Sequence, residues 1–142
     1  MIIELVEDDC EIIAKNKYNV FAALRQSDVK SVMVYFDGCA DDGQMTEWEV
    51  ELRQGEYISD PELLPKVSVE RLAHCWHQKK RVTTTALLAV ALEDLCYDLL
   101  DESYSGWGNN DGSYGALMFD VEQSNVTLEY NRRTVHTTTM EV

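Results

Sequence analysis

GWGNNDGSYGALMFD, residues 106–120, is the stretch around which the rest of the chain is organised. A helical pattern ends before it and a strand pattern begins inside it, and it holds four glycines and an Asn-Asn-Asp run. A second stretch, DGCADDGQ at residues 37–44, has a similar composition. Glycine, asparagine and aspartate are typical of tight turns because they tolerate positive φ or bond their own backbone. We therefore expect a loop in each stretch.

Strand patterns flank both loops. Residues 30–36 are β-branched and aromatic, and residues 46–53 alternate apolar with charged side chains, as half-buried strands do. These segments predict an antiparallel hairpin joined by the eight residues of 37–44. Residues 114–121 and 125–131 alternate in the same way and predict a second hairpin.

Helical periodicity predicts two helices. Apolar residues near a 3.6-residue period extend over residues 2–26, where Asn16 and Asn19 leave two shorter helices as an alternative. The clearer helix covers residues 86–102, with the threonines at 83–85 as its expected caps. The remaining segments are predicted as irregular at 54–66, as either a short helix or a strand at 67–78, and as an added edge strand at 134–142.

This order of elements predicts one α+β domain over residues 1–142, with an antiparallel sheet of about four to five strands and two main helices packed on one face. No apolar run reaches the roughly 18 residues of a membrane span, and the acidic N-terminus lacks the positive charge of a signal peptide. The four cysteines are widely spaced and are expected as free thiols. We therefore expect a cytoplasmic protein.

The charge balance restricts the class of partner. The chain holds 26 acids and 12 bases, for a formal net charge of −14. Such a charge disfavours direct binding to nucleic acid or to anionic membranes. It suits a protein that meets a basic surface on another protein, or one that binds cations.

A row of glutamates occupies the polar side of the second predicted strand. Glu47, Glu49 and Glu51 alternate with apolar residues, so they share one face. The row is either a solvated face or an acidic surface for a basic partner. The partner-binding residues predicted on the second interpretation are Glu47, Glu49, Glu51, Asp41, Asp42, Trp107, Asn109 and Asn110.

The two loops also suggest an alternative site. Carboxylate oxygens are the ligands that Mg²⁺ and Ca²⁺ prefer, and such an ion would support hydrolysis or phosphoryl chemistry. The spacing matches no EF-hand, and turn chemistry alone explains the same residue types. On this interpretation the metal ligands are Asp37, Asp41, Asp42 and Asp111; on the leading one the protein has no cofactor.

The HCWH sequence at residues 74–77 is a weaker candidate. His74 and His77 are spaced to share a helical face and bind zinc, but zinc needs two further ligands. Cys75 beside either histidine is a possible nucleophile, although nothing in the sequence marks an oxyanion hole. No P-loop, dinucleotide-binding glycine motif or G-x-S-x-G is present either.

Two motifs carry a resemblance to a known family. Residues 37–44 follow D-G-x-x-D-x-G-Q, and residues 106–120 follow G-W-x-N-N-D-G-x-x-G-x-x-x-F-D. Together they resemble a domain of unknown function found in small bacterial and phage proteins on plasmids and other mobile elements. The resemblance implies that context and brings no activity and no catalytic residues. The matching positions are Asp37, Asp42, Gln44, Trp107, Asn109, Asn110, Asp111 and Gly112.

The sequence therefore predicts an acidic, non-enzymatic interaction protein. Its partner would be a protein with a basic, nucleic-acid-handling surface, and the acidic face would mimic a phosphate backbone. In a phage or plasmid context this describes an inhibitor such as an anti-defence protein. The alternative is a divalent-cation-dependent hydrolase or metal-binding protein that uses the two loops.

Overall fold

The computed structural model describes residues 9–39, 42–75, 80–104, 106–108, 112–134 and 137–141, without the side chains of residues 9–11, 42, 73–75 and 80–81. The elements are α1 (Asp9–Gln26), β1 (Val29–Cys39), β2 (Asp42–Leu52), β3 (Tyr57–Ile58), the 3₁₀ turn η1 (Pro61–Leu63), β4 (Ser68–Cys75), β5 (Lys80–Leu87), α2 (Leu88–Ser103), β6 (Ser113–Asp120) and β7 (Asn125–Arg132).

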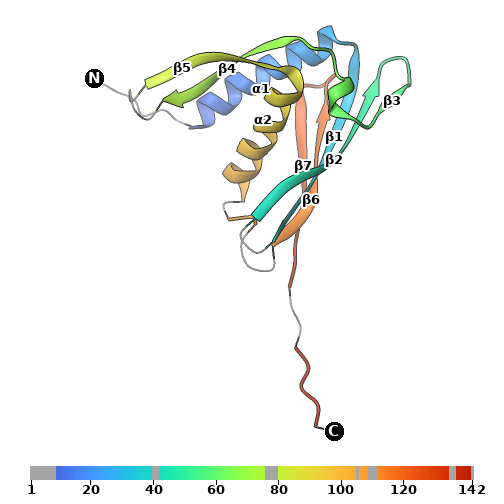
Figure 1. Cartoon of the computed structure of the whole chain (residues 1–142), viewed down its shortest axis with the longest axis vertical. Coiled ribbons are helices and arrows are strands. Elements are labelled where there is room, and N and C mark those ends of the chain that lie inside the picture. Colours follow the sequence, from blue (N-terminus) through green and yellow to red (C-terminus); the bar gives the residue numbers. More distant parts are fainter. Residues whose placement is uncertain are drawn as a thin grey trace.

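Five strands form one antiparallel sheet in the order β3-β2-β1-β6-β7, and β4 and β5 form a separate two-stranded ribbon. The helices and the ribbon lie to one side of the sheet (Figure 1). The predicted α+β class, with two helices and an antiparallel sheet of five strands, is confirmed.

The core lies between this sheet and the two helices. Alternate residues of β1 point inward, so Val32, Val34 and Phe36 are almost fully buried. Phe21 of α1 packs against Phe119 of β6, with ring centroids 5.9 Å apart. The stripe that helical spacing predicts on α2 is buried at Leu88, Ala91, Leu92 and Leu95, whereas its other two members differ, since Leu99 is partly buried and Val90 is exposed. Cys96 and Leu100 complete the buried side of this helix. Each large apolar side chain buried in this way contributes about 1.5–3 kcal/mol.

The helix α1 is continuous through its two asparagines. The Asn16 side chain donates to the Leu72 carbonyl at 3.0 Å and accepts from the Leu72 amide at 2.7 Å. Asn19 donates to the Glu70 carbonyl at 2.9 Å. These residues weaken the helical pattern in the sequence because they attach β4 to α1 instead of packing in the core. The predicted helical residues 2–8 lie outside the described part of the chain.

The predicted eight-residue loop at 37–44 is wrong. The ladder between β1 and β2 continues through Asp37–Gln44, Gly38–Gly43 and Cys39–Asp42. Only residues 40 and 41, which are not described, separate the two strands. Gly38 and Gly43 therefore occupy strand positions.

The connection between the hairpin and α2 is also more regular than expected. Residues 68–75 form β4, the strand alternative for that segment, and the threonines at 83–85 lie in β5 opposite residues 70–72. The prediction that these threonines cap the helix is therefore wrong, because β-branched residues favour the strand ladder. The helix α2 begins at Leu88, with Leu87 as an N-cap that makes no side-chain hydrogen bond.

Two further predictions need correction. The segment 54–66 is not wholly irregular, since it contains β3 and η1. The predicted edge strand at 134–142 does not form in the described residues of that segment. Figure 1 shows this end of the chain running away from the body of the molecule instead of along β7. The composition of this segment favours a strand, but the segment does not lie along a sheet edge with which it could pair.

Candidate partner-binding surface

One face of the five-stranded sheet is turned away from the helices. We call this the open face, and its side chains alternate with the core-facing ones along each strand, although Ala116 of β6 is covered by its neighbours and only 4% exposed. The open face comprises Glu47, Glu49 and Glu51 of β2, Ser31, Met33, Tyr35 and Asp37 of β1, Tyr114, Ala116, Met118 and Asp120 of β6, and Asn125, Thr127, Glu129 and Asn131 of β7.

The predicted glutamate row forms one side of the open face. Glu47 and Glu49 are exposed, and Glu51 is partly buried. The Tyr35 hydroxyl donates to Glu49 Oε2 at 3.0 Å, and the Ser31 hydroxyl donates to Glu51 Oε1 at 3.2 Å. Lys30 Nζ lies 3.7 Å from Glu51 Oε2. The row is therefore a solvent-facing set of carboxylates, anchored to β1 by hydroxyl groups.

The opposite side of the open face also carries acids. Sheet register places Glu47, Tyr35, Ala116 and Glu129 in one continuous row across β2, β1, β6 and β7. The hydrogen bond to Glu49 raises the pKa of Tyr35 above its ordinary value of 10, and the charges of Glu49, Glu47 and Glu129 raise it further. Carboxylates from both sides thus act on the middle of the face.

Glu129 and Asp120 are acids of this face that the sequence analysis did not single out. Both are exposed. For Glu129 the signal was present in the alternation of β7, where polar residues occupy every second position from Asn125 to Asn131. It pointed to a solvent-facing side but gave no strand order, so it could not place these acids beside the glutamate row.

The two glycine-rich stretches meet at one end of the sheet. Trp107 lies against the glycine pair Gly38 and Gly43, and a Cβ added to Gly43 would sit 2.3 Å from the indole. The indole N–H donates to Asp101 Oδ1 at 2.8 Å, and the ring packs edge-on against Phe36 at 5.6 Å. Trp107 is only 7% exposed, so its ring is engaged in the core.

Gly112 is part of the same junction. Its φ is +82°, and a Cβ there would lie 1.6 Å from the Gly38 carbonyl oxygen. Beside it, the Ser113 hydroxyl donates to the Trp107 carbonyl at 2.6 Å. Glycines at 38, 43 and 112 are therefore explained by close approach of backbone and indole.

Arg133 binds the carboxylate of Asp37 from the end of β7. Its two terminal nitrogens lie 3.0 Å from the two oxygens of Asp37, and one of them also donates to the carbonyls of Gly38 and Ser113 at 3.2 Å. The guanidinium lies 4.9 Å from the centre of the Tyr114 ring. Its hydrogen bond to Asp37 raises the pKa of Arg133. Asp37 thus has a cation partner within the chain.

Residues 12–142 match the model of a family of unknown function, DUF6878. The chain belongs to this family. Neither a curated protein nor a solved structure matches it. The matched range covers every described strand, so the resemblance is confirmed as far as membership of a family of unknown function. In the part of this DUF6878 chain that the structure describes, no helix is long and apolar enough to cross a membrane.

Several predicted site residues of the DUF6878 chain lie outside the described residues. These are Asp41, Asn109, Asn110, Asp111, Trp76 and His77, together with the side chains of Asp42, His74 and Cys75. The backbone of Asp42 pairs with Cys39, and those of His74 and Cys75 belong to β4. Among the described residues, no group of three or more histidine, cysteine, aspartate or glutamate side chains is placed to hold a metal.

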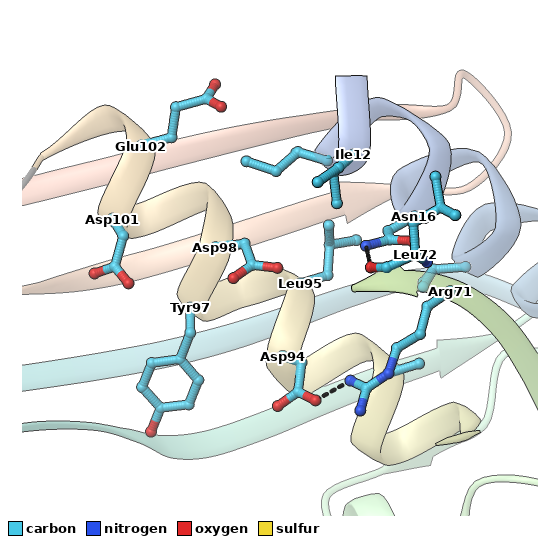
Figure 2. A pocket seen from close by; sticks show the side chains of 13 residues that line it. Ile12, Asn16, Arg71, Leu72, Asp94, Leu95, Tyr97, Asp98, Asp101 and Glu102 are labelled. Carbon is cyan, nitrogen blue, oxygen red and sulfur yellow. Dashed lines mark hydrogen bonds and ion pairs between the residues drawn. The ribbon is translucent and has the colours of Figure 1, made fainter. Parts of the chain in front are cut away.

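A hollow of about 690 Å³ lies between α1, α2 and β4 in this DUF6878 chain. Its wall on α2 carries Asp94, Asp98, Asp101 and Glu102 (Figure 2). Asp94 forms an ion pair with Arg71, and Asp101 accepts from Trp107. Polar groups of the hollow therefore link the helices to the ribbon and to the junction.

Proposed function

We propose that this DUF6878 protein is a non-enzymatic interaction module that binds a basic surface of a protein partner through the open face of its sheet. The observation that supports this most directly is the charge of that face. It presents six acids, at Asp37, Glu47, Glu49, Glu51, Asp120 and Glu129. The cations that the structure pairs with them are Lys30 and Arg133.

The sheet also fixes the spacing of these charges. Alternate residues of a strand lie about 6.6–6.8 Å apart, and β2 is held along its length by the ladder to β1 and near Glu51 by β3 as well. A row of carboxylates on such a scaffold is set in position before binding, so a partner loses less free energy in ordering it. This favours a docking surface over a merely solubilising one.

The finer proposal concerns the kind of partner. Nucleic-acid-handling proteins hold basic surfaces that contact phosphates, and an acidic protein with a fixed carboxylate array competes for the same surfaces. One strand of DNA presents a phosphate about every 3.4 Å along its axis, which is twice the density along β2. Through charge alone, the open face would therefore bind a basic partner more weakly than DNA does. Apolar contacts must supply the remaining binding free energy. In a phage or plasmid context, such a competitor would act as an inhibitor of host defence.

The metal-dependent alternative has less support. Its ligand set was Asp37, Asp41, Asp42 and Asp111, and Asp37 is already held by both terminal nitrogens of Arg133. A cation would have to displace that guanidinium. We therefore place the interaction role first.

The test is a pulldown from bacterial lysate at low and at moderate salt. The bait is the full chain, compared with the triple variant Glu47→Lys, Glu49→Lys and Glu51→Lys. A matched control carries Glu62→Lys, Glu70→Lys and Glu141→Lys, three exposed acids outside the open face. Each triple variant moves the formal net charge from −14 to −8, because every replacement adds two charges.

We expect the first variant to lose a basic protein that the wild type and the control retain at moderate salt. The recovered protein should also release bound DNA or RNA when the wild type is added. Equal retention by both variants would refute the role of the open face. Equal loss in both would show that only net charge matters, and would also count against a specific interface.

A further inference from the structure

The middle of the open face is apolar. Met33 of β1 and Met118 of β6 are direct partners in the ladder, and both are partly exposed. The next row places the partly exposed Tyr35 beside Ala116, which is nearly covered by its neighbours. These four residues, which we call the floor, lie on the two central strands, with the three glutamates of β2 to one side and Glu129 of β7 to the other. The floor accounts for the apolar contacts that charge alone does not provide.

The width of the face sets the shape of what it can hold. The strands β2 and β7 are separated by β1 and β6, which is three strand spacings of about 4.8 Å, or roughly 14 Å. An α-helix with its side chains is about 10–12 Å across. A helix lying over β1 and β6 would therefore have Glu47 and Glu49 along one flank and Glu129 along the other.

From this arrangement we propose that the partner presents an amphipathic basic α-helix to the open face. Its apolar stripe covers the floor, and lysines or arginines on both flanks of the stripe meet the two acidic sides. This inference rests on the proposed function and specifies the partner's contact element. Methionine suits such a floor because its flexible thioether adapts to different apolar stripes.

Other occupants fit less well. A second copy of this chain would bring the same acids against each other, and like charges in contact are strongly unfavourable. An extended peptide adds to the edge of a sheet, where backbone groups are unpaired, and not to its face. The charge on both sides of the floor therefore favours a helix with two basic flanks.

The experiment uses the full chain and a synthetic peptide of about 18 residues, long enough for appreciable helix content when leucines and arginines are set at helical spacing. Its control is a scrambled peptide of identical composition and charge that has no apolar stripe. Affinity is measured by fluorescence anisotropy at moderate salt. The binding site is mapped by NMR from the methyl signals of the five methionines. Each signal is assigned by substituting one methionine at a time.

We expect the amphipathic peptide to bind at least about tenfold more tightly than the scrambled one. The Met33 and Met118 methyl signals should shift, while those of Met45, on the core side of β2, and Met140, in the C-terminal segment, should not. The double variant Met33→Thr and Met118→Thr should lose about tenfold in affinity, and the exposed-methionine control Met140→Thr should lose none.

Three outcomes would overturn the inference. Equal binding of both peptides would show that charge alone suffices, which leaves the proposed function standing without the helix. Binding that moves neither the Met33 nor the Met118 methyl would place the peptide elsewhere, for example in the hollow between α1 and α2. If neither peptide binds, but the pulldown recovers a partner that requires the glutamate row, the proposed interface stands and the helical ligand is rejected.

Discussion

Replacing Gly43 with alanine tests the contact that joins the two glycine-rich stretches. The added Cβ would lie 2.3 Å from Cη2 and 2.5 Å from Cζ3 of Trp107, where carbon atoms normally approach to about 3.5–4.0 Å. The indole cannot retreat easily, because its N–H bonds to Asp101 and its ring packs against Phe36 and Tyr97. The substitution therefore overpacks a filled site.

The expected magnitude follows from two opposing terms. Overpacking of this kind costs about 1–3 kcal/mol, while replacing glycine by alanine inside a strand regains about 0.5–1 kcal/mol of backbone entropy. The 2.3 Å approach places the overpacking cost in the upper half of that range, about 2–3 kcal/mol, so the net loss in the free energy of unfolding should be about 1–2.5 kcal/mol. An unfolding entropy of about 2.1 cal/mol/K per residue over 142 residues converts this loss to a fall in Tm of roughly 3–8 °C.

The assay is a double-mutant cycle with Trp107→Phe, followed by thermal and denaturant unfolding. Phenylalanine lacks the outer atoms of the indole, so Gly43→Ala should cost at least about 1 kcal/mol less in that background. Gly55→Ala is the control, because nothing lies within 4 Å of its Cβ position and its cost comes from a φ of +95°. Its effect should be the same in both backgrounds. An unchanged cost of Gly43→Ala in the Trp107→Phe protein would refute the reasoning.

Two other predictions concern the open face and the start of α2. Because Tyr35 has a raised pKa, the folded chain favours its neutral phenol, and the stabilisation is present below pH 10 and is lost as pH rises through the folded pKa. Ultraviolet titration of the wild type against Tyr35→Phe should show this late ionisation, and Glu49→Gln should lower it; a midpoint at or below 10 in the wild type would contradict the hydrogen bond. Leu87→Asp should stabilise the protein by about 0.5–1 kcal/mol relative to Leu87→Ala, because Leu87 has N-cap geometry without a side-chain cap; equal melting temperatures would argue against the cap.

Local periodicity was enough to predict much of this fold. The alternation around Glu47, Trp48, Glu49 and Val50 predicted which side of β2 faces water, and burial follows it. The apolar stripe of α2 was predicted in the same way, and Leu88, Ala91, Leu92 and Leu95 of that stripe are buried, whereas Val90 is exposed. Side-chain direction repeats every two residues in a strand and every 3.6 in a helix. The buried side of an element can therefore be predicted from the spacing of apolar residues within that segment.

At the glycines, residue composition alone gave a wrong prediction, because it does not show which distant segment packs against them. The stretch at 37–44 has the residues of a turn, yet all but two of its positions pair in the β1–β2 ladder. Trp107 lies more than sixty residues later in the chain and needs flat strand backbone to pack against. The threonines at 83–85 were misassigned for a related reason, since their ladder partners in β4 are held in place by Asn16 and Asn19 of α1.

The sequence by itself determined the α+β class, the acidic balance and the side of β2 that carries the glutamate row, because these depend on composition and on spacing within one segment. Only the tertiary structure decided that Glu129 shares a row with Glu47, and that Met33 and Met118 lie between the acidic sides. Strand order and register come from pairing between segments as far apart in the chain as β1 and β6. The candidate interface is a product of that pairing, and no single stretch of the chain contains it.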